Sequence, residues 1–421
     1  MRIYEVNTAL LRTPLEDVDW SFVPDVDAVW LMGVWERSPA GMAIALDDPG
    51  LMAGMRAAVP DLRADDVIGS PYCVRDYVVD PRFGDLAAAR AKLAERGLKL
   101  ILDYVPNHVA PDHPWVPEHC IRGTEEDLAR DPVSWLRVGD AIVARGRDPY
   151  FPAWPDVVQL DAFSPGLRAA ARELLAHLAT LCDGVRCDMA MLMTNEVFAR
   201  TWHREPPPTE FWPDVFDDRL TFIAEAYWDM EWALHQQGFD YAYDKRLYDR
   251  LAHEDAASVR AHLAADASYL LRFIENHDEP RAAAVFGERA RAAAVILATV
   301  PGGKLYHHGQ FDGARVKVPV FLARGPVEAP DDALHEFYSR IVGLRVTDWR
   351  LLDTDHPQLL AWAFSDHVVA VNFGPTELWS RIRVDLDAAL TDVLTGLTYE
   401  RSGPELIVGL PPWGAHLFTV S

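Results

Sequence analysis

Eight short apolar runs recur along the first 310 or so residues, and helix-like stretches such as 86–96 and 165–181 lie between many of them. The runs are Ile3–Val6, Ala28–Val34, Leu98–Val105, Gly184–Met189, Thr221–Ala226, Tyr241–Tyr243, Leu271–Glu275 and Lys304–Tyr306. This alternation is typical of parallel βαβ units, and eight of them predict an α/β fold of the (β/α)8 or TIM-barrel type. A doubly wound open sheet is the alternative. No GxGxxG turn follows the first run, which argues against a dinucleotide-binding version of that sheet.

The spacing of the runs is uneven in one place. Val105 and Gly184 lie 79 residues apart, whereas one βα repeat needs roughly 30. The excess, residues 109–160, is rich in Pro, Asp and Trp and predicts an inserted subdomain after the third strand. Beyond about residue 349, short strand-like segments separated by turn residues predict a C-terminal antiparallel β-sandwich. We therefore expect a catalytic barrel at 1–108 and 161–348, an inserted domain at 109–160 and a sandwich at 349–421.

Composition limits the partners. The chain has 40 Lys and Arg against 64 Asp and Glu, a net charge of −24, and so much negative charge repels nucleic acid and anionic membranes. The four cysteines form no CxxC pair, and no signal-like segment or run of 18 apolar residues is present. We expect a cytoplasmic protein with neither nucleic acid nor membrane as partner. The oligomeric state stays open. Without an HxH or HExxH motif we expect no metal, and we expect no other cofactor.

Polar residues cluster at the carboxyl ends of four predicted strands. In a barrel these ends share one face, which holds active sites. The sequence therefore predicts that three carboxylates lying 37 and 53 residues apart converge there. The polar residues are Asp103, Asn107 and His108; Arg186 and Asp188; Glu225; and Asn276, His277 and Asp278.

Two of the carboxylates have contrasting surroundings. Arg186 and Asp188 lie two apart on one strand and face the same way, so the guanidinium keeps Asp188 ionised and suited to act as a nucleophile. Glu225 lies in the apolar and aromatic segment IAEAYW, where desolvation raises a carboxyl pKa as a general acid requires. Such a pair is what retaining glycoside hydrolysis needs.

These segments also carry a resemblance. DYVPNH, GVRCDMA, FIAEAYW and FIENHD resemble, in order, the four conserved regions of the α-amylase superfamily, glycoside hydrolase family 13. IGSPYCVRDYVVDPRFGD, VVQLDAF and PGGKLYHHGQ resemble further segments of that family. The resemblance covers roughly residues 1–345. It implies a barrel with an inserted domain after the third strand and a C-terminal β-sandwich, the layout already predicted.

Site roles follow from the resemblance position by position. It implies that Asp188 is the nucleophile, Glu225 the acid/base and Asp278 the third carboxylate, which holds sugar hydroxyls. It implies that the sugar before the scissile bond is surrounded by Arg186, His108 and His277 and stacked on Tyr72. Asp103 matches a barrel-interior residue, and Asn107 matches a position that often binds calcium.

The function expected is a retaining α-glycoside hydrolase or transglycosylase acting on α-glucosidic bonds of short oligosaccharides or small glucosides, by double displacement through a glycosyl-enzyme. A glycoside phosphorylase of the same superfamily is one alternative, and a non-catalytic barrel that binds sugar or a partner is another. The second alternative is disfavoured because all three carboxylates are present. Where many amylases carry Lys-His after the second region, this chain has Met191-Leu192. If that pair lines the leaving-group site, it predicts a preference for short oligosaccharides or small glucosides; otherwise it only packs inside the protein.

Overall fold

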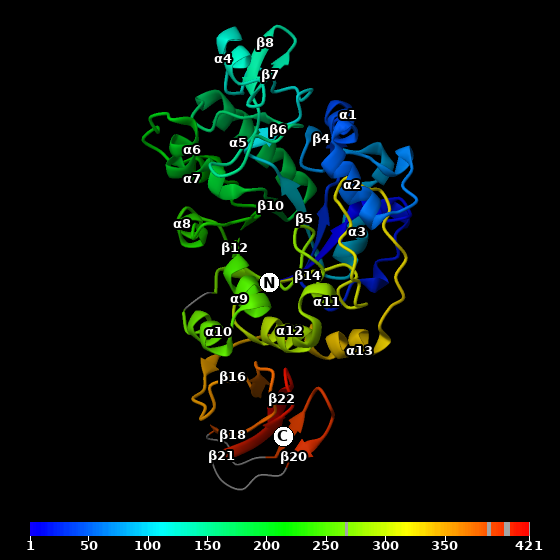
Figure 1. Ribbon diagram of the computed structural model, residues 1–421, viewed down its shortest axis with the longest axis vertical. Coiled ribbons are helices and arrows are strands. Elements are labelled where there is room, and N and C mark those ends of the chain that lie inside the picture. Colours follow the sequence, from blue (N-terminus) through cyan, green and yellow to red (C-terminus); the bar gives the residue numbers. More distant parts are fainter. Residues whose placement is uncertain (266–267, 385–388, 400–404, 421) are drawn as a thin grey trace.

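A closed barrel of eight parallel strands forms the centre of the molecule (Figure 1). The computed structural model describes residues 1–265, 268–384, 389–399 and 405–420. Each predicted run contributes one barrel strand, so the (β/α)8 prediction is confirmed and the open sheet is excluded. The strands are β1 (Arg2–Asn7), β2 (Ala28–Met32), β5 (Lys99–Tyr104), β10 (Gly184–Cys187), β11 (Thr221–Ala224), β12 (Tyr241–Tyr243), β13 (Leu270–Arg272) and β14 (Gly303–His307).

Most of the helices lie around the outside of this barrel. In the 17-residue helix α5 (Pro165–Leu181), the Ser164 side chain accepts from the Leu167 N–H at the first turn, and the buried side chains recur at helical spacing. None of the helices in the described ranges is long and apolar enough to cross a membrane. The other helices are α3 (Leu86–Glu95), α6 (Asn195–Trp202), α7 (Phe211–Val215), α8 (Glu231–Gln236), α9 (Lys245–His253), α10 (Ala256–Leu263), α11 (Ala282–Val285), α12 (Ala290–Thr299) and α13 (Asp332–Ile341).

Two long excursions leave the barrel next to its carboxyl face. The first follows β2 and contains β3 (Trp35–Arg37), α1 (Pro39–Asp47), α2 (Pro49–Ala58) and β4 (Val74–Val79). The second, residues 308–331 between β14 and α13, contains no helix or strand, and we call it the strap. In Figure 1 the strap runs beside α2, where its Leu322 packs against Met55 and Val59.

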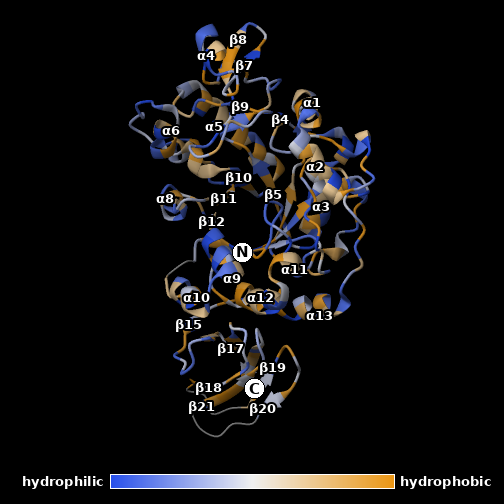
Figure 2. Ribbon diagram, viewed as in Figure 1, coloured by the Kyte–Doolittle hydropathy of each residue, from blue (hydrophilic) through white to orange (hydrophobic). Residues whose placement is uncertain are grey.

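The segment between β5 and β10 lies outside the barrel, as predicted for an insertion. β6 (His108–Val109) pairs with β9 (Val158–Gln159), and β7 (Trp135–Val138) pairs with β8 (Ala141–Ala144). A short helix, α4 (Glu125–Arg130), precedes this hairpin. Figure 2 shows β8 as hydrophobic, and its residues are buried. The limits of the insertion as a separate domain stay a prediction.

The C-terminal part consists of two antiparallel sheets that enclose a second apolar core. Helix α12 lies between the barrel and this part, and the indole N–H of Trp362 donates to Thr299 Oγ1 over 3.2 Å. The larger sheet has the order β15 (Arg350–Leu351), β16 (Leu359–Phe364), β17 (His367–Asn372), β22 (Ala415–Val420), β19 (Leu390–Asp392) and β20 (Thr398–Tyr399), and the smaller one pairs β18 (Leu378–Arg383) with β21 (Glu405–Leu410).

Candidate active site

The guanidinium of Arg186 lies among the predicted carboxylates at the carboxyl face of the barrel. Its Nη1 is 2.7 Å from Asp188 Oδ1, and its Nη2 is 2.7 Å from Glu225 Oε2. Asp278 Oδ2 is 3.8 Å from Nη2. The structure therefore brings together three carboxylates that follow β10, β11 and β13 and are far apart in the sequence.

Aromatic side chains surround this guanidinium. It lies 5.3 Å from the ring centre of Trp30 and 5.1 Å from that of Tyr72, within the range of cation–π attraction. Its Nε donates to Tyr243 Oη over 3.3 Å. Burial disfavours the charge, but Glu225 and the other neighbours outweigh burial and raise the pKa of Arg186 well above its usual value. The site is thus built around a permanent cation.

Asp103 supports the floor beneath Arg186. Its carboxyl group accepts from the Trp30 indole N–H at 3.2 Å and from the Gly33 N–H at 2.7 Å, and its carbonyl accepts from Trp35 Nε1 at 2.7 Å. Gly33 has φ +79°, and a Cβ there would lie 2.7 Å from Pro71 Cβ, so only glycine fits this approach. Burial raises the pKa of Asp103 to about 6.

Glu225 is buried and held from both sides. Its Oε2 accepts from the Met189 N–H at 2.7 Å, and its Oε1 accepts from the Tyr227 hydroxyl at 2.9 Å. Met189 adopts a left-handed conformation, φ 44° and ψ 46°, which directs its N–H to this carboxyl group. Burial raises the pKa of Glu225 to about 7, against the opposing attraction of Arg186. This agrees with the desolvation argument made from the sequence.

His277 connects Tyr72 to Asp278. Its Nε2 lies 2.9 Å from Asp278 Oδ2 and 2.7 Å from Tyr72 Oη, and the two rings stack with centres 5.4 Å apart. Burial disfavours a charged ring, but Asp278 and Glu5 outweigh burial and raise the pKa of His277 to about 10. Desolvation opposes ionisation of Asp278, but His277 and Arg186 outweigh it and lower the pKa of this carboxyl.

His108 lies on the other side of the nucleophile candidate. Its Nε2 is 3.9 Å from Asp188 Oδ2, and its ring centre is 5.0 Å from that of Trp154 in the insertion. Burial lowers the pKa of His108 below its ordinary value, against the opposing attraction of Asp188. Every site residue predicted from the sequence therefore belongs to one network of contacts at the carboxyl face.

Two residues of the site went unnoticed in the sequence. Tyr227 lies two residues after Glu225, and this spacing on an extended segment could have indicated a shared face. Glu5 is a carboxylate within the apolar run Ile3–Val6, but the sequence does not indicate its partner His277, which is 272 residues away.

The residues around Asn107 do not fit a calcium site. The Asn107 side-chain oxygen accepts from Gln159 Nε2 at 2.8 Å, and the same amide nitrogen also donates to the Asn107 carbonyl at 2.9 Å. Calcium needs six to eight oxygen ligands with carboxylates among them. A neutral amide group stands here instead, and the described residues contain no cluster of three or more His, Cys, Asp or Glu that could hold a metal ion.

A strong chelator is therefore expected to leave the melting temperature unchanged within about 1 °C. A bound ion at 100 times its Kd adds about 2.7 kcal/mol, which moves the melting temperature of a chain this large by several degrees. Differential scanning calorimetry with and without EDTA measures the difference. A large drop in melting temperature that calcium restores and magnesium does not would contradict this expectation.

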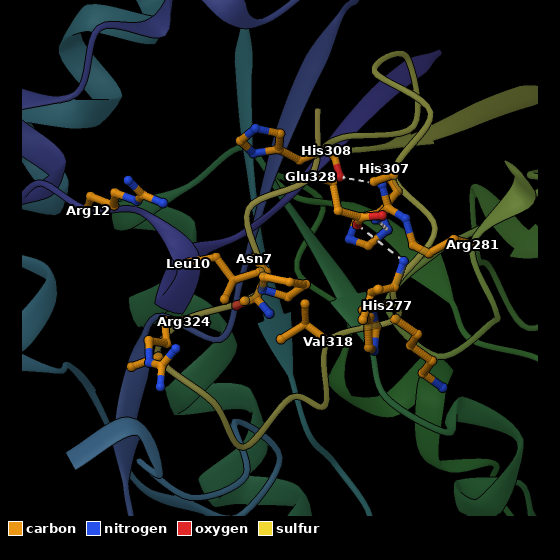
Figure 3. A pocket seen from close by; sticks show the side chains of 16 residues that line it. Asn7, Leu10, Arg12, His277, Arg281, His307, His308, Val318, Arg324 and Glu328 are labelled. Atoms are coloured by element: carbon orange, nitrogen blue, oxygen red, sulfur yellow. Dashed lines mark hydrogen bonds between the residues drawn. The ribbon is translucent and has the colours of Figure 1, made fainter. Parts of the chain in front are cut away.

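The strap closes one side of the site. Lys317 Nζ donates to the Asp278 carbonyl, and the Phe321 carbonyl accepts from the Ile68 N–H at 2.8 Å, four residues before Tyr72. Arg324 pairs with Asp66 at 2.7 Å. Beneath the strap lies a chamber of about 240 Å³. Figure 3 shows it between Arg12 and Arg324 on one side and the cluster of His277, Arg281 and His307 on the other.

A second cavity, of about 420 Å³, lies next to the residues that contact Glu225. Met189 and Tyr227, which hold that carboxyl group, contribute to its wall. Its other lining residues are Asp148, Phe151, Trp228, Asp229, Glu231, Lys245, Arg246 and Asp249. The cavity is therefore bordered by both aromatic and charged side chains.

Met191 and Leu192 do not line this cavity, so the prediction of an apolar leaving-group wall is wrong. Their exposed fractions are 0% and 3%. The left-handed turn at Met189 directs the following 3-10 turn inward, where the Trp212 indole N–H donates to the Ala190 carbonyl over 2.9 Å. The pair packs inside the protein, as the alternative reading held.

Comparison with known proteins yields α-amylases and, over a shorter segment, the amino acid transporter heavy chain SLC3A1 of Mus musculus, which is 44% identical over 89 residues, 20% of this chain and 12% of the relative. The chain is 30% identical over 237 residues to the α-amylase MalA of Haloarcula japonica, which covers 52% of this chain and 32% of the relative. It is 20% identical over 295 residues to α-amylase 3 of Dictyoglomus thermophilum, which covers 62% and 57%. The chain thus spans less than two thirds of these relatives. No family model matches it.

The fold is shared over the whole chain. The crystal structure of a noncanonic maltogenic α-amylase, AmyB from Thermotoga neapolitana, superimposes with a TM-score of 0.69 and 20% identity, covering 100% of this chain and 99% of the other. At this identity the likeness concerns the fold, that is, the barrel and the appended C-terminal sheets. The residues of the site carry any further argument.

Proposed function

We propose that this chain is a member of the α-amylase superfamily and a retaining glycoside hydrolase or transglycosylase acting on α-glucosidic bonds; its likeness to α-amylases supports the first part. One observation carries the proposal: a single buried guanidinium holds Asp188 and Glu225 on its two terminal nitrogens, each at 2.7 Å. Retaining glycosidases need two carboxyl groups about 5–5.5 Å apart, one ionised and one protonated. The surroundings of Glu225 favour its protonated form.

The mechanism has two steps. In the first, Glu225 gives its proton to the glycosidic oxygen while an Asp188 oxygen bonds to the anomeric carbon and the leaving group departs. In the second, Glu225 takes a proton from water or a sugar hydroxyl, whose oxygen displaces Asp188. Asp278, ionised beside His277, accepts hydrogen bonds from sugar hydroxyls, and Tyr72 and His108 border the same sugar. Tyr227 and the Met189 N–H stabilise Glu225 when it is a carboxylate.

The strap supports a site for one terminal glucosyl unit. It joins the backbone of Asp278 to the segment before Tyr72 through Lys317 and Phe321, so continuous backbone crosses the end where a longer chain would continue. The cavity beyond Glu225 receives the leaving group. We infer that the substrates are short oligosaccharides or small glucosides.

The decisive experiment is product analysis over a substrate panel. Maltose to maltotetraose, isomaltose, trehalose, sucrose and soluble starch are each incubated with and without phosphate, and the products are followed by ¹H NMR and chromatography. We expect the α-anomer to appear first. A β-anomer formed first would exclude retention. Sugar 1-phosphate as the main product would make the chain a phosphorylase. The absence of turnover on every substrate would favour a non-catalytic sugar-binding barrel.

We expect kcat/KM to be at least about tenfold higher for maltose to maltotetraose than for soluble starch. A starch chain that continues past the terminal glucosyl unit would leave a sugar at the strap without its hydrogen bonds, which costs about 1–3 kcal/mol. Arg324→Ala, which removes the pairing with Asp66, is expected to raise starch cleavage relative to maltose. Arg137→Ala removes a surface pair with Glu125 in the insertion and is the matched control. Rapid internal cleavage of starch by the unaltered protein would contradict this inference.

A further inference from the structure

We propose that Glu5 is a positioning residue of this site: through His277 it keeps an N–H directed at Asp278. The proposal rests on the function proposed above. Glu5 lies on β1, 272 residues before His277 in the sequence, and is fully buried. Its Oε1 is 2.6 Å from His277 Nδ1, and the other ring nitrogen, Nε2, is 2.9 Å from Asp278 Oδ2.

Carboxylates at both ring nitrogens constrain the protonation of His277. A neutral imidazole has one N–H, so it could donate to only one of the two carboxylates; protonated at Nδ1, its Nε2 would accept from the Tyr72 hydroxyl and offer Asp278 no donor. The imidazolium donates at both nitrogens. The pKa of His277, raised to about 10, agrees with that geometry. Glu5 thus balances the ring charge on one side, and Asp278 receives the N–H on the other.

The other groups near the ring do not replace Glu5. Tyr72 Oη is 2.7 Å from Nε2, on the Asp278 side of the ring. The edge-on indole of Trp30, 5.5 Å away between ring centres, carries no charge. Asp103 is close enough for His277 to lower its pKa, but it makes no contact with the ring among the interactions described above. Within the described residues, only Glu5 is recorded in contact with Nδ1.

Glu5 itself faces several charged or titratable groups. His307 on β14 and His277 lower its pKa, against burial, which raises it, and Asp278 also raises it. Burial raises the pKa of Tyr243 on β12, and the charge of Glu5 raises it further. Its second oxygen, Oε2, has no hydrogen-bond partner among the described residues. A buried ion pair is a poor source of stability, because apolar replacement is often neutral or stabilising. The charge is therefore better explained by its effect on His277.

Replacing Glu5 by Gln keeps the size of the side chain and removes its charge. The amide oxygen still accepts from Nδ1–H, so the ring reverts at moderately alkaline pH to the neutral form with Nε2 unprotonated. Asp278 then loses its donor. A lost charged hydrogen bond corresponds to roughly a ten- to hundredfold fall in kcat/KM. The ratio of variant to unaltered kcat/KM is expected to fall from pH 6 to pH 8, because acid restores the imidazolium.

The direct test is ¹H–¹⁵N NMR of the histidine ring nitrogens in the full-length protein, with His277→Gln used to assign the signals. At pH 8 the unaltered protein is expected to show both His277 nitrogens protonated, and Glu5→Gln only one. Asp392→Asn is the control, since Asp392 is a buried carboxylate that pairs with His416 in the C-terminal sheets. It should leave the His277 signals and the pH dependence of kcat/KM unchanged. Glu5→Asp keeps the charge and serves if Glu5→Gln does not fold; it should retain the doubly protonated ring.

A doubly protonated His277 in Glu5→Gln at pH 8, or a variant-to-unaltered ratio independent of pH, would overturn the proposal. A singly protonated His277 in Glu5→Asp would also overturn it. The NMR result needs no substrate. If the unaltered protein cleaves no glycoside but its ring nitrogens behave as expected, the proposed function fails while the link between Glu5 and His277 stands. If it is active and the spectra do not change, only this proposal fails.

Discussion

Asp188→Asn is expected to lower kcat on every glucoside by at least about a thousandfold without unfolding the protein. The amide is a poor nucleophile, so the covalent intermediate no longer forms, and removing a nucleophile elsewhere costs up to about a millionfold in kcat. Asn keeps the volume of Asp and can still accept from Arg186 Nη1, now at 2.7 Å. The melting temperature should therefore change little.

Steady-state kinetics on the preferred substrate and circular dichroism on the same preparation measure the two effects. Asp76→Asn, which changes a partly buried aspartate outside the site, is the control and should keep near-normal turnover. A second readout is chemical rescue: with Asp188→Ala, azide can occupy the vacated space and form a glycosyl azide of inverted configuration. Near-normal turnover by Asp188→Asn would show that the nucleophile is another group.

Glu225→Gln is expected to lower kcat/KM on natural glucosides by about a hundredfold to ten-thousandfold, the usual contribution of general acid catalysis. A substrate with a good leaving group, such as a nitrophenyl glucoside, needs less protonation and should lose less. The two losses, compared under the same conditions, separate proton donation from binding.

The pH profile gives the second signature of Glu225. As the acid in the free enzyme it must be protonated, and its pKa is about 7. We therefore expect kcat/KM to fall tenfold per pH unit above about pH 7. This alkaline limb of the pH profile should vanish in Glu225→Gln. Tyr227→Phe removes a hydrogen bond to the carboxylate form, so the limb should move to higher pH. A limb that persists in Glu225→Gln would assign the proton to another residue.

Much of this architecture could be predicted from the sequence because its signals are local. Each barrel strand is a short apolar run, and polar residues follow four of them directly. A parallel barrel then requires these ends to meet on one face. The pairing of Arg186 with Asp188 follows from two-residue alternation along one strand.

The remainder depends on contacts that leave no local pattern. The strap has no hydrophobic period, and its docking through Arg324 on Asp66 joins residues 258 apart. Glu5 is a carboxylate within an apolar run, but its partner His277 is 272 residues away and no local pattern links the two. Met191 and Leu192 were misplaced because a single left-handed residue, Met189, turns the chain inward.

The strap also bears on the order of events in turnover. In the proposed function the strap closes the glucosyl end, so substrate, water and product all pass through the cavity lined by Met189 and Tyr227. The first product must leave before water or an acceptor sugar can reach the covalent intermediate, so turnover is strictly sequential at that opening. A second substrate molecule competes with water for the same space. A high substrate concentration should therefore favour transfer of the glucosyl unit to a second substrate molecule over hydrolysis.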